Sequence, residues 1–314
     1  MLESLSSVRS RLPILKTLRI ELWEHSAASP MDLFAHAPRL RDFIAGEHVT
    51  EKLLTIPWNR LQHFNINRST NRPQQVLNLL ALASNVERAQ FRVSTSHIVW
   101  PNTEAPGSVQ LRNLRSLIMV AHGLDPVPFM VILHMPKIRE LSLAINMPVE
   151  SRRPLWAFLS SHGTLEKLAL YWGDAFAQMD RYIPYAPNAV RVLDDVKQLR
   201  VLELPQSEPA LISADFLERF ALLDQSGTPI LGPNLQILLF HYSYHINYQS
   251  FARTLQSRFP PGGEVTLKTV TILCPQRDLV SKLKTFQKSV WWDQIRDLGI
   301  NMQLQASESY AVWW

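Results

Sequence analysis

The chain has 314 residues, of which 46% are hydrophobic and 19% are charged. This composition excludes an intrinsically disordered chain, which is poor in hydrophobic residues and rich in charge. The 32 Lys and Arg residues exceed the 27 Asp and Glu residues by 5, and we interpret this excess as spread over the whole chain, without a run of five or more basic residues. The charge therefore does not predict nucleic-acid binding, which normally clusters basic residues on one face.

From the N-terminus, the first predicted element is a short amphipathic helix, because apolar residues recur at helical spacing between positions 2 and 12. A second helix is expected over residues 30–37. Ser29 can cap its first turn, and Pro38 ends it. A short apolar strand follows each of these helices.

The strands share a six-residue pattern, L-x-x-L-x-L, in which other apolar residues also occupy the three anchor positions. Eleven copies begin at Leu15, Leu40, Leu61, Val86, Leu114, Ile138, Leu165, Leu199, Leu235, Leu267 and Ile295. The mean period over these ten steps is 28 residues. Within a copy, the last two anchors, such as Leu168 and Leu170, lie on one face of a strand because side chains alternate.

Helices are expected between the later strands, where Pro or Gly residues mark the turns. Their predicted ranges are 73–83, 128–135, 154–161, 214–225, 249–258 and 279–290. The two longest segments between strands are expected to contain inserted loops at 182–187 and 205–209, and residues 310–314 are expected to cover the last repeat. Such insertions often carry binding, and neutral variation of surface loops explains them equally well.

The pattern and its period are typical of leucine-rich repeats. We therefore expect an α/β fold over residues 1–314: a single solenoid with parallel strands on the concave face and helices on the convex face. A set of unrelated buried strands in an α/β sheet is the alternative. It does not explain why Lys or Arg so often follows the first anchor, as at Lys16, Arg41 and Arg115.

Three segments refine the comparison: APRLRDF at 37–43, PWNRLQHF at 57–64 and MPKIRELSL at 135–143. The sequences of these segments resemble the repeat region of fungal F-box proteins. The resemblance implies the substrate-recognition part of a ubiquitin ligase adaptor, with a Skp-type adaptor as partner only if an F-box lies upstream. The sequence departs from the usual repeat, because Asn146 alone occupies the Asn or Cys position three residues after the last anchor.

Signatures of chemistry are weak. The sequence lacks the nucleophile-elbow, phosphate-loop and HExxH motifs, so we expect no enzyme activity, no cofactor and no metal. His241 and His245 lack a third ligand, and the pair Asp194–Asp195 is interpreted as a solvated helix end. Two other functions stay open: a hydrolase-like enzyme on an unrecognised α/β sheet, and a weakly basic nucleic-acid-associated protein.

A protein partner is expected on the concave face, where the positions between and beside the anchors point. Polar and basic residues there come from the third and fourth copies, and apolar or aromatic residues from later ones, a mixture typical of protein interfaces. The candidate partner-binding residues are His63, Asn65, Asn67, Arg88, Gln90, Arg92, Ile118, Val120, Tyr171, His241, Tyr242 and Tyr244. They are equally compatible with the ordinary exposed face of a sheet.

Three further features favour an intracellular protein, cytoplasmic or nuclear. The single cysteine, Cys274, excludes an internal disulfide and is expected to be a buried thiol. Residues 1–9 lack the apolar core of a secretory signal. No apolar run approaches the roughly 18 residues that a membrane-spanning helix requires, so we expect no membrane partner.

Overall fold

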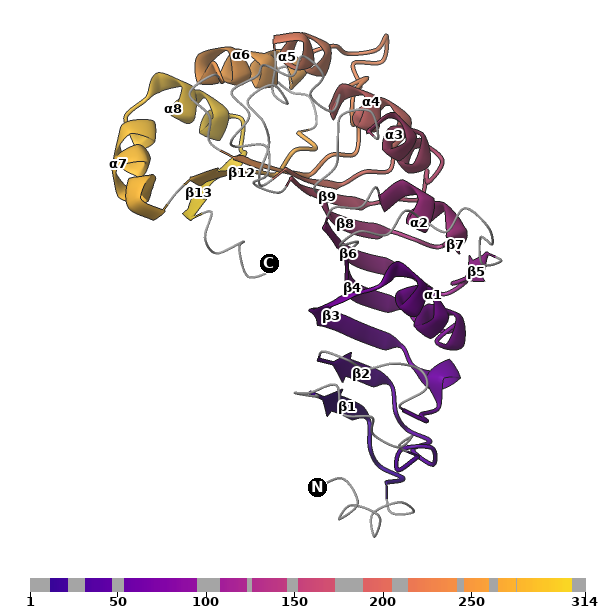
Figure 1. Ribbon diagram of the computed structural model, residues 1–314. Coiled ribbons are helices and arrows are strands. Elements are labelled where there is room, and N and C mark those ends of the chain that lie inside the picture. The colour runs from indigo at the N-terminus through magenta and orange to yellow at the C-terminus, as the bar shows by residue number, and fades with distance from the viewer. Residues whose placement is uncertain are drawn as a thin grey trace. The chain divides into compact units, whose positions relative to one another are not determined.

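The computed structural model describes residues 12–21, 32–46, 54–94, 108–122, 126–145, 152–172, 189–204, 214–241, 246–259, 265–274 and 276–306. The chain forms two compact units, Met1–Met147 (unit 1) and Pro148–Trp314 (unit 2). Each unit combines parallel strands with helices (Figure 1). The expected α/β class is therefore confirmed, whereas one continuous solenoid over the whole chain stays a prediction.

Unit 1 contains a parallel sheet in the order β1-β2-β3-β4-β6-β8, with a small parallel pair β5-β7 beside it. Consecutive copies of the pattern supply neighbouring strands of this sheet. Its elements are β1 (Thr17–Ile20), β2 (Asp42–Ala45), η2 (Trp58–Arg60), β3 (His63–Asn71), α1 (Pro73–Leu82), β4 (Arg88–Ser94), β5 (Val109–Gln110), β6 (Ser116–His122), α2 (Pro126–Ile132), β7 (Leu133–His134) and β8 (Glu140–Ile145).

The anchors build the core of unit 1, because the two anchors within each strand share one face of the sheet and nearly all of the anchors are buried. Helices α1 and α2 lie together on one face of this sheet (Figure 1). Leu141 and Leu143 are 1% and 0% exposed, as the pattern predicts. Phe91 of β4 packs on Phe129 of α2 with ring centroids 5.5 Å apart. Burial of such side chains contributes about 1.5–3 kcal/mol each, so this face supplies most of the unit's stability.

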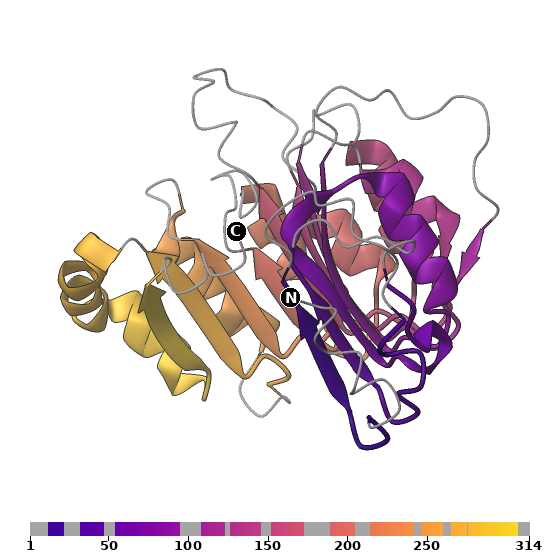
Figure 2. The ribbon, with the colours of Figure 1, turned by 60° about the horizontal axis from the view of Figure 1, so that its bottom comes forward.

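Unit 2 contains a parallel sheet in the order β9-β10-β11-β12-β13. The last helices, α7 and α8, lie together on one side of β12 and β13 (Figure 2, yellow). The elements are α3 (Arg152–Ser160), β9 (Lys167–Trp172), α4 (Ala189–Asp195), β10 (Val201–Leu204), α5 (Ala214–Phe220), β11 (Ile237–His241), α6 (Tyr248–Arg258), β12 (Thr269–Cys274), α7 (Gln276–Gln287), α8 (Val290–Asp297) and β13 (Asn301–Ala306).

The core of unit 2 follows the same rule. Leu168 and Leu170 of β9 are 0% and 1% exposed. Phe240 of β11 meets Phe251 of α6 edge-on, with ring centroids 5.7 Å apart. Cys274 is buried at the end of β12, as expected.

The same turn precedes nine strands: β1, β2, β3, β4, β6, β8, β9, β10 and β11. The backbone N–H of the first anchor donates to the carbonyl three residues earlier, at 3.1 Å in the copies of Leu40, Val86, Leu199 and Leu235. The next two N–H groups donate to a carbonyl of the preceding copy. Those of Arg41 and Asp42, for example, bond to the Lys16 carbonyl at 2.8 and 3.0 Å. This arrangement holds successive turns in register within a unit.

Two predictions about single elements are wrong. Residues 33–36, within the helix expected over 30–37, form turns, because Pro38 disfavours helical conformation at Ala37 and too few residues remain to nucleate a helix. The eleventh copy, beginning at Ile295, is also misplaced. Ile295 lies in α8, which was not predicted, and Met302 and Leu304 of β13 pair with the anchors of β12 instead.

The remaining helix predictions agree in place, with shifted ends. The range 214–225 is the largest difference, because α5 ends at Phe220 and a tight turn follows. No range was predicted for helix α4, although the pair Asp194–Asp195 at its end was interpreted as a helix end. The first helix expected over residues 2–12, apart from Leu12, lies outside the described residues, as do the loops at 182–187 and 205–209 and the terminal segment 310–314.

Candidate functional site

The unit 1 sheet carries a second face that is free of anchors and lies opposite α1 and α2 (Figure 1). Strand pairing aligns its side chains in two rows across the strands. The first row contains Thr17, Asp42, His63, Arg88, Ser116 and Glu140, and the second contains Arg19, Ile44, Asn65, Gln90, Ile118 and Ser142. We call these twelve residues the anchor-free face of unit 1; all twelve are exposed or half-buried.

The first row contains a three-residue polar contact between neighbouring strands. Asp42 of β2 lies 2.5 Å from Nδ1 of His63 through one carboxylate oxygen, and its other oxygen accepts from the Thr17 hydroxyl at 3.0 Å. The His63 side chain remains 50% exposed and that of Asp42 30%. His63 and Arg88 are register partners, so an imidazole and a guanidinium stand side by side on this row.

The second row mixes amides with aliphatic side chains. The Asn65 amide donates to the Gln90 side-chain oxygen at 3.2 Å. Ile118 is the register partner of Gln90, and Ile44 is the partner of Asn65. Polar groups that are fixed by cross-strand contacts, interspersed with aliphatic groups, make a surface that offers both hydrogen bonds and apolar contact.

Most of the predicted residues of unit 1 lie on this face. His63, Asn65, Arg88, Gln90 and Ile118 belong to its two rows. Arg92 is half-buried beyond the rows, opposite Val120, which is 1% exposed and therefore not accessible from solvent. Asn67 lies in β3, and its side chain is outside the described residues.

The prediction missed seven members of the face: Thr17, Arg19, Asp42, Ile44, Ser116, Glu140 and Ser142. They occupy the same positions between anchors in the first, second, fifth and sixth copies. A position between anchors therefore identifies these seven residues, just as it identified the candidates of the third and fourth copies.

The predicted residues of unit 2 have different surroundings. Tyr171 is 7% exposed, and its role in binding a partner stays a prediction. His241 is the last residue of β11, whereas Tyr242 and Tyr244 lie outside the described residues. On the anchor-free positions of this sheet, Ala169, Leu239, Thr271 and Leu273 are buried at 0%, 3%, 4% and 0% exposure. The row of unit 2 that corresponds to the first row of unit 1 is nevertheless half-buried or exposed; it contains Lys167, Val201, Ile237, Thr269 and Asn301.

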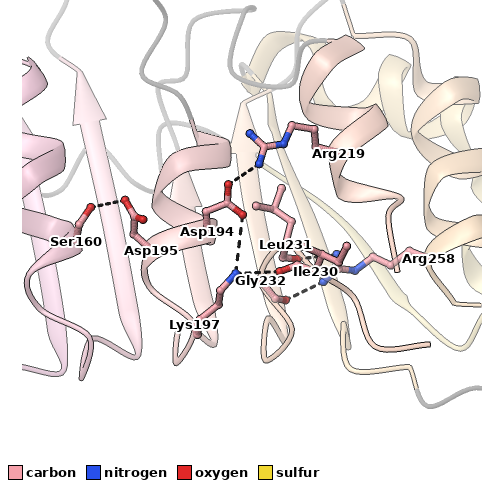
Figure 3. A network of polar contacts seen from close by, with 9 residues as sticks. All are labelled: Ser160, Asp194, Asp195, Lys197, Arg219, Ile230, Leu231, Gly232 and Arg258. Atoms are coloured by element: carbon pink, nitrogen blue, oxygen red, sulfur yellow. Dashed lines mark hydrogen bonds and ion pairs between the residues drawn. The ribbon is translucent and has the colours of Figure 1, made fainter. Parts of the chain in front are cut away.

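The carboxylate pair at the end of α4 connects this helix to neighbouring helices of unit 2 (Figure 3). Asp194 accepts from Arg219 of α5 at 2.5 Å, and Lys197 lies 3.8 Å from its other oxygen. Asp195 accepts from the Ser160 hydroxyl of α3 at 2.5 Å. The two carboxylates contact different neighbours, which agrees with a structural role at a helix end.

A buried arginine at the end of α6 makes further polar contacts in unit 2 (Figure 3). Arg258 is 1% exposed and donates to the carbonyls of Phe220, Leu231 and Gly232 at 3.0, 2.7 and 2.7 Å. Its guanidinium carbon also lies 3.9 Å from the centre of the Phe220 ring. Burial lowers the pKa of Arg258 to about 9, so the side chain is charged at neutral pH. The arginine fixes the loop after α5 against α6.

Polar side chains also connect successive turns, at the position immediately before the first anchor. The amide of Asn85 donates to the Asn59 carbonyl at 2.8 Å, and the amide of Asn234 donates to the Lys197 carbonyl at 2.8 Å. Arg60 makes the equivalent bond to the Pro38 carbonyl at 3.0 Å. The Asn146 position that the usual repeat would employ lies outside the described residues.

Neither the chemistry of the described residues nor comparisons with known proteins assign a ligand or a family to the chain. Within the described ranges, no group of three or more His, Cys, Asp or Glu side chains is placed to hold a metal ion, and His245 lies outside them. None of the described helices has the length and apolar character needed to cross a bilayer. No protein-family model and no curated protein matches the chain.

Proposed function

We propose that this protein is a non-catalytic scaffold that binds another protein through the anchor-free face of unit 1. The observation that carries the proposal is the exposure of that face. Parallel sheets are normally covered on both faces, and their strands are then apolar throughout. Here one face is apolar and buried, and the other presents two rows of mostly polar side chains that are exposed or half-buried along six neighbouring strands, whereas Val120 and Ala144 beyond these rows are buried.

The chemistry of the face supports a protein as the partner. Arginine guanidinium groups and amides supply directional hydrogen bonds, and the half-buried Ile44 and Ile118 supply apolar area beside them. The contacts Asp42–His63 and Asn65–Gln90 hold four of these side chains in place before binding, which reduces the entropy that association would cost.

Two further parts of the proposal rest on the repeat pattern. We propose that the strands and helices belong to a leucine-rich-repeat solenoid, which the recurring turn before nine of the strands supports. We also propose that the scaffold selects the substrate of an F-box-type ubiquitin ligase. A Skp-type adaptor should then bind only through an F-box segment. Retention of such an adaptor by residues 1–314 alone would contradict this part.

The test is a binding measurement with a matched surface control. A partner is first recovered with the wild-type chain, purified, and titrated against the double variant Arg88→Ala/Gln90→Ala. We expect the Kd to rise by at least about fivefold, because truncation of contact residues near the centre of an interface typically costs more than about 1 kcal/mol. The control is Arg253→Ala, on the exposed surface of α6. Equal losses in both variants would place the binding site elsewhere.

A further inference from the structure

The turns that precede the strands of unit 1 form a strongly basic edge. We define the turn edge of unit 1 as the residues from three before to one after each first anchor: 12–16, 37–41, 58–62, 83–87, 111–115 and 135–139. These segments contain eight Lys and Arg residues and one acidic residue, Glu87. In unit 2, the corresponding segments 162–166, 196–200, 232–236 and 264–268 contain three basic residues and two acidic residues.

The same asymmetry appears in the whole units. Residues 1–147 contain 16 Lys and Arg and 11 Asp and Glu residues, a difference of +5, whereas residues 148–314 contain 16 of each. The net charge of the chain therefore resides in unit 1, and the turn edge carries half of that unit's basic residues.

The fold places these cations close together although they are distant in sequence. Backbone bonds from Arg41 and Asp42 to Lys16, and from Arg139 and Glu140 to Arg115, stack the turns in register. Neighbouring parallel strands lie about 4.8 Å apart, so successive turns repeat at that interval. Six of the eight basic residues form two groups, with Arg39, Arg41 and Arg60 on one side of Glu87 and Arg112, Arg115 and Lys137 on the other.

These side chains are held at the surface and keep unused donors. Five of the six are exposed, and Arg41 is half-buried. Arg41 donates through one terminal nitrogen to the Leu40 and Arg60 carbonyls, at 3.2 and 3.3 Å, and Lys137 lies 3.4 Å from the Asn113 amide oxygen. Each arginine has five N–H donors in a planar fork that fits a carboxylate, so most of the donor capacity stays directed to solvent.

We propose that the turn edge of unit 1 binds an acidic polypeptide segment, rich in Asp and Glu, that runs across successive turns. The inference deepens the proposed protein-binding function and rests on it, because it gives the chemistry of part of the partner. Charge complementarity selects an anionic chain. Single-stranded nucleic acid usually also requires exposed aromatic side chains on which bases stack. The turn-edge segments contain one aromatic residue, Trp58, which is buried, and the twelve residues of the anchor-free face include no Phe, Tyr or Trp.

The experiment measures binding of labelled probes by fluorescence anisotropy. The probes are a Glu-Ser repeat peptide, a Gln-Ser repeat peptide of the same length, and an oligothymidylate of equal charge. The edge variant is Arg112→Gln/Arg115→Gln/Lys137→Gln. The control variant is Arg253→Gln/Lys284→Gln/Lys288→Gln, which removes the same charge from exposed positions of unit 2. Thermal unfolding of both variants at the wild-type midpoint verifies that they fold.

We expect the edge variant to lose about tenfold in affinity for the Glu-Ser peptide, about 1.4 kcal/mol, because three exposed ion pairs each contribute modestly. The control variant should stay within about twofold of the wild type, since its charges lie outside the proposed site. Equal losses in the two variants, or binding of the Gln-Ser peptide, would overturn the proposal. Tighter, edge-dependent binding of the oligothymidylate would assign the edge to nucleic acid instead.

The two proposals can fail separately. A purified partner that is lost in the Arg88→Ala/Gln90→Ala variant but retained by the edge variant would refute the acidic-segment inference and leave the proposed function standing. A partner that is unaffected by the double variant, combined with edge-dependent binding of the Glu-Ser peptide, would refute the anchor-free face as the binding site.

Discussion

Replacement of Arg258 by Met removes a buried cation while it keeps a long apolar side chain in the same space. The variant loses three hydrogen bonds, to the carbonyls of Phe220, Leu231 and Gly232, and leaves these carbonyls without that donor. It also loses the contact of the guanidinium with the Phe220 ring. Since these groups connect α6 to the loop after α5, the whole of this region should be destabilised.

Two opposing terms set the magnitude. Hydrogen bonds from a charged donor contribute about 1.5–3 kcal/mol each, so three contribute about 4.5–9 kcal/mol. Burial lowers the pKa of Arg258 to about 9. At about 1.4 kcal/mol per pKa unit, this lowering corresponds to a penalty of about 5 kcal/mol on the charged form, which the Met variant avoids. The difference spans about −0.5 to 4 kcal/mol, and its midpoint is a net loss of about 2 kcal/mol in the free energy of unfolding.

A second substitution tests the sign of each term. Arg258→Lys keeps a buried cation and its penalty, but a shorter ammonium cannot bond to all three carbonyls as the planar fork does. The Lys variant should therefore be less stable than the Met variant, although it is chemically closer to the wild type.

Urea unfolding, monitored by circular dichroism, should give free energies of unfolding that decrease in the order wild type, Arg258→Met, Arg258→Lys. Arg253→Met, at an exposed position of the same helix, should change the unfolding free energy by less than about 0.5 kcal/mol. A Met variant within that margin of the wild type, or a Lys variant more stable than Met, would refute the account.

Three further predictions test the fold. Leu141→Ala should lower the free energy of unfolding by about 2–5 kcal/mol in urea titrations, because Leu141 is 1% exposed and a cavity would remain. Asn85→Ala should cost about 0.5–1.5 kcal/mol through its lost bond to Asn59, whereas Asn59→Ala, which keeps the accepting carbonyl, should cost less. The hydroxyl of Ser226, followed by the backbone N–H of Thr228, lowers the pKa of Asp224. The stabilisation is present above the unfolded pKa and is lost as the pH falls through the folded pKa, so acid titrations below about pH 4 should be steeper for the wild type than for Asp224→Asn.

The strand positions could be predicted from the sequence because burial dictates them directly. Anchors such as Leu61 and Leu168 are 0% exposed, and any polar residue there would leave a buried group without a partner. The eleventh copy failed for the same physical reason. Ile295 fits the pattern, but Trp292 and Ile295 lie three residues apart on one buried stripe of α8. Gly299, with φ of +81°, ends that helical segment, so the strand begins only at Asn301.

The connections between turns were not predictable from the family pattern. That pattern places the bonding side chain after the last anchor, whereas the described repeats place it immediately before the first, at Arg60, Asn85 and Asn234. Either position can supply a donor to a neighbouring turn. The sequence does not show which carbonyl lies within reach, because that depends on how the turns stack.

The turn edge of unit 1 is a charged site that runs of consecutive basic residues in the sequence do not reveal. Arg41 and Arg60 lie 19 residues apart in sequence, yet the terminal nitrogen of Arg41 bonds to the Arg60 carbonyl. A run of consecutive basic residues would instead alternate between the two faces of a strand and dilute its own charge. The modest net charge of +5 therefore reflects one basic unit and one neutral unit, and the interpretation of an excess spread over the whole chain is wrong. Because repeated positions are brought together by strand pairing, charge in such a chain has to be counted by position within the repeat. Counted in this way, the turn edge of unit 1 stands out before any partner is known.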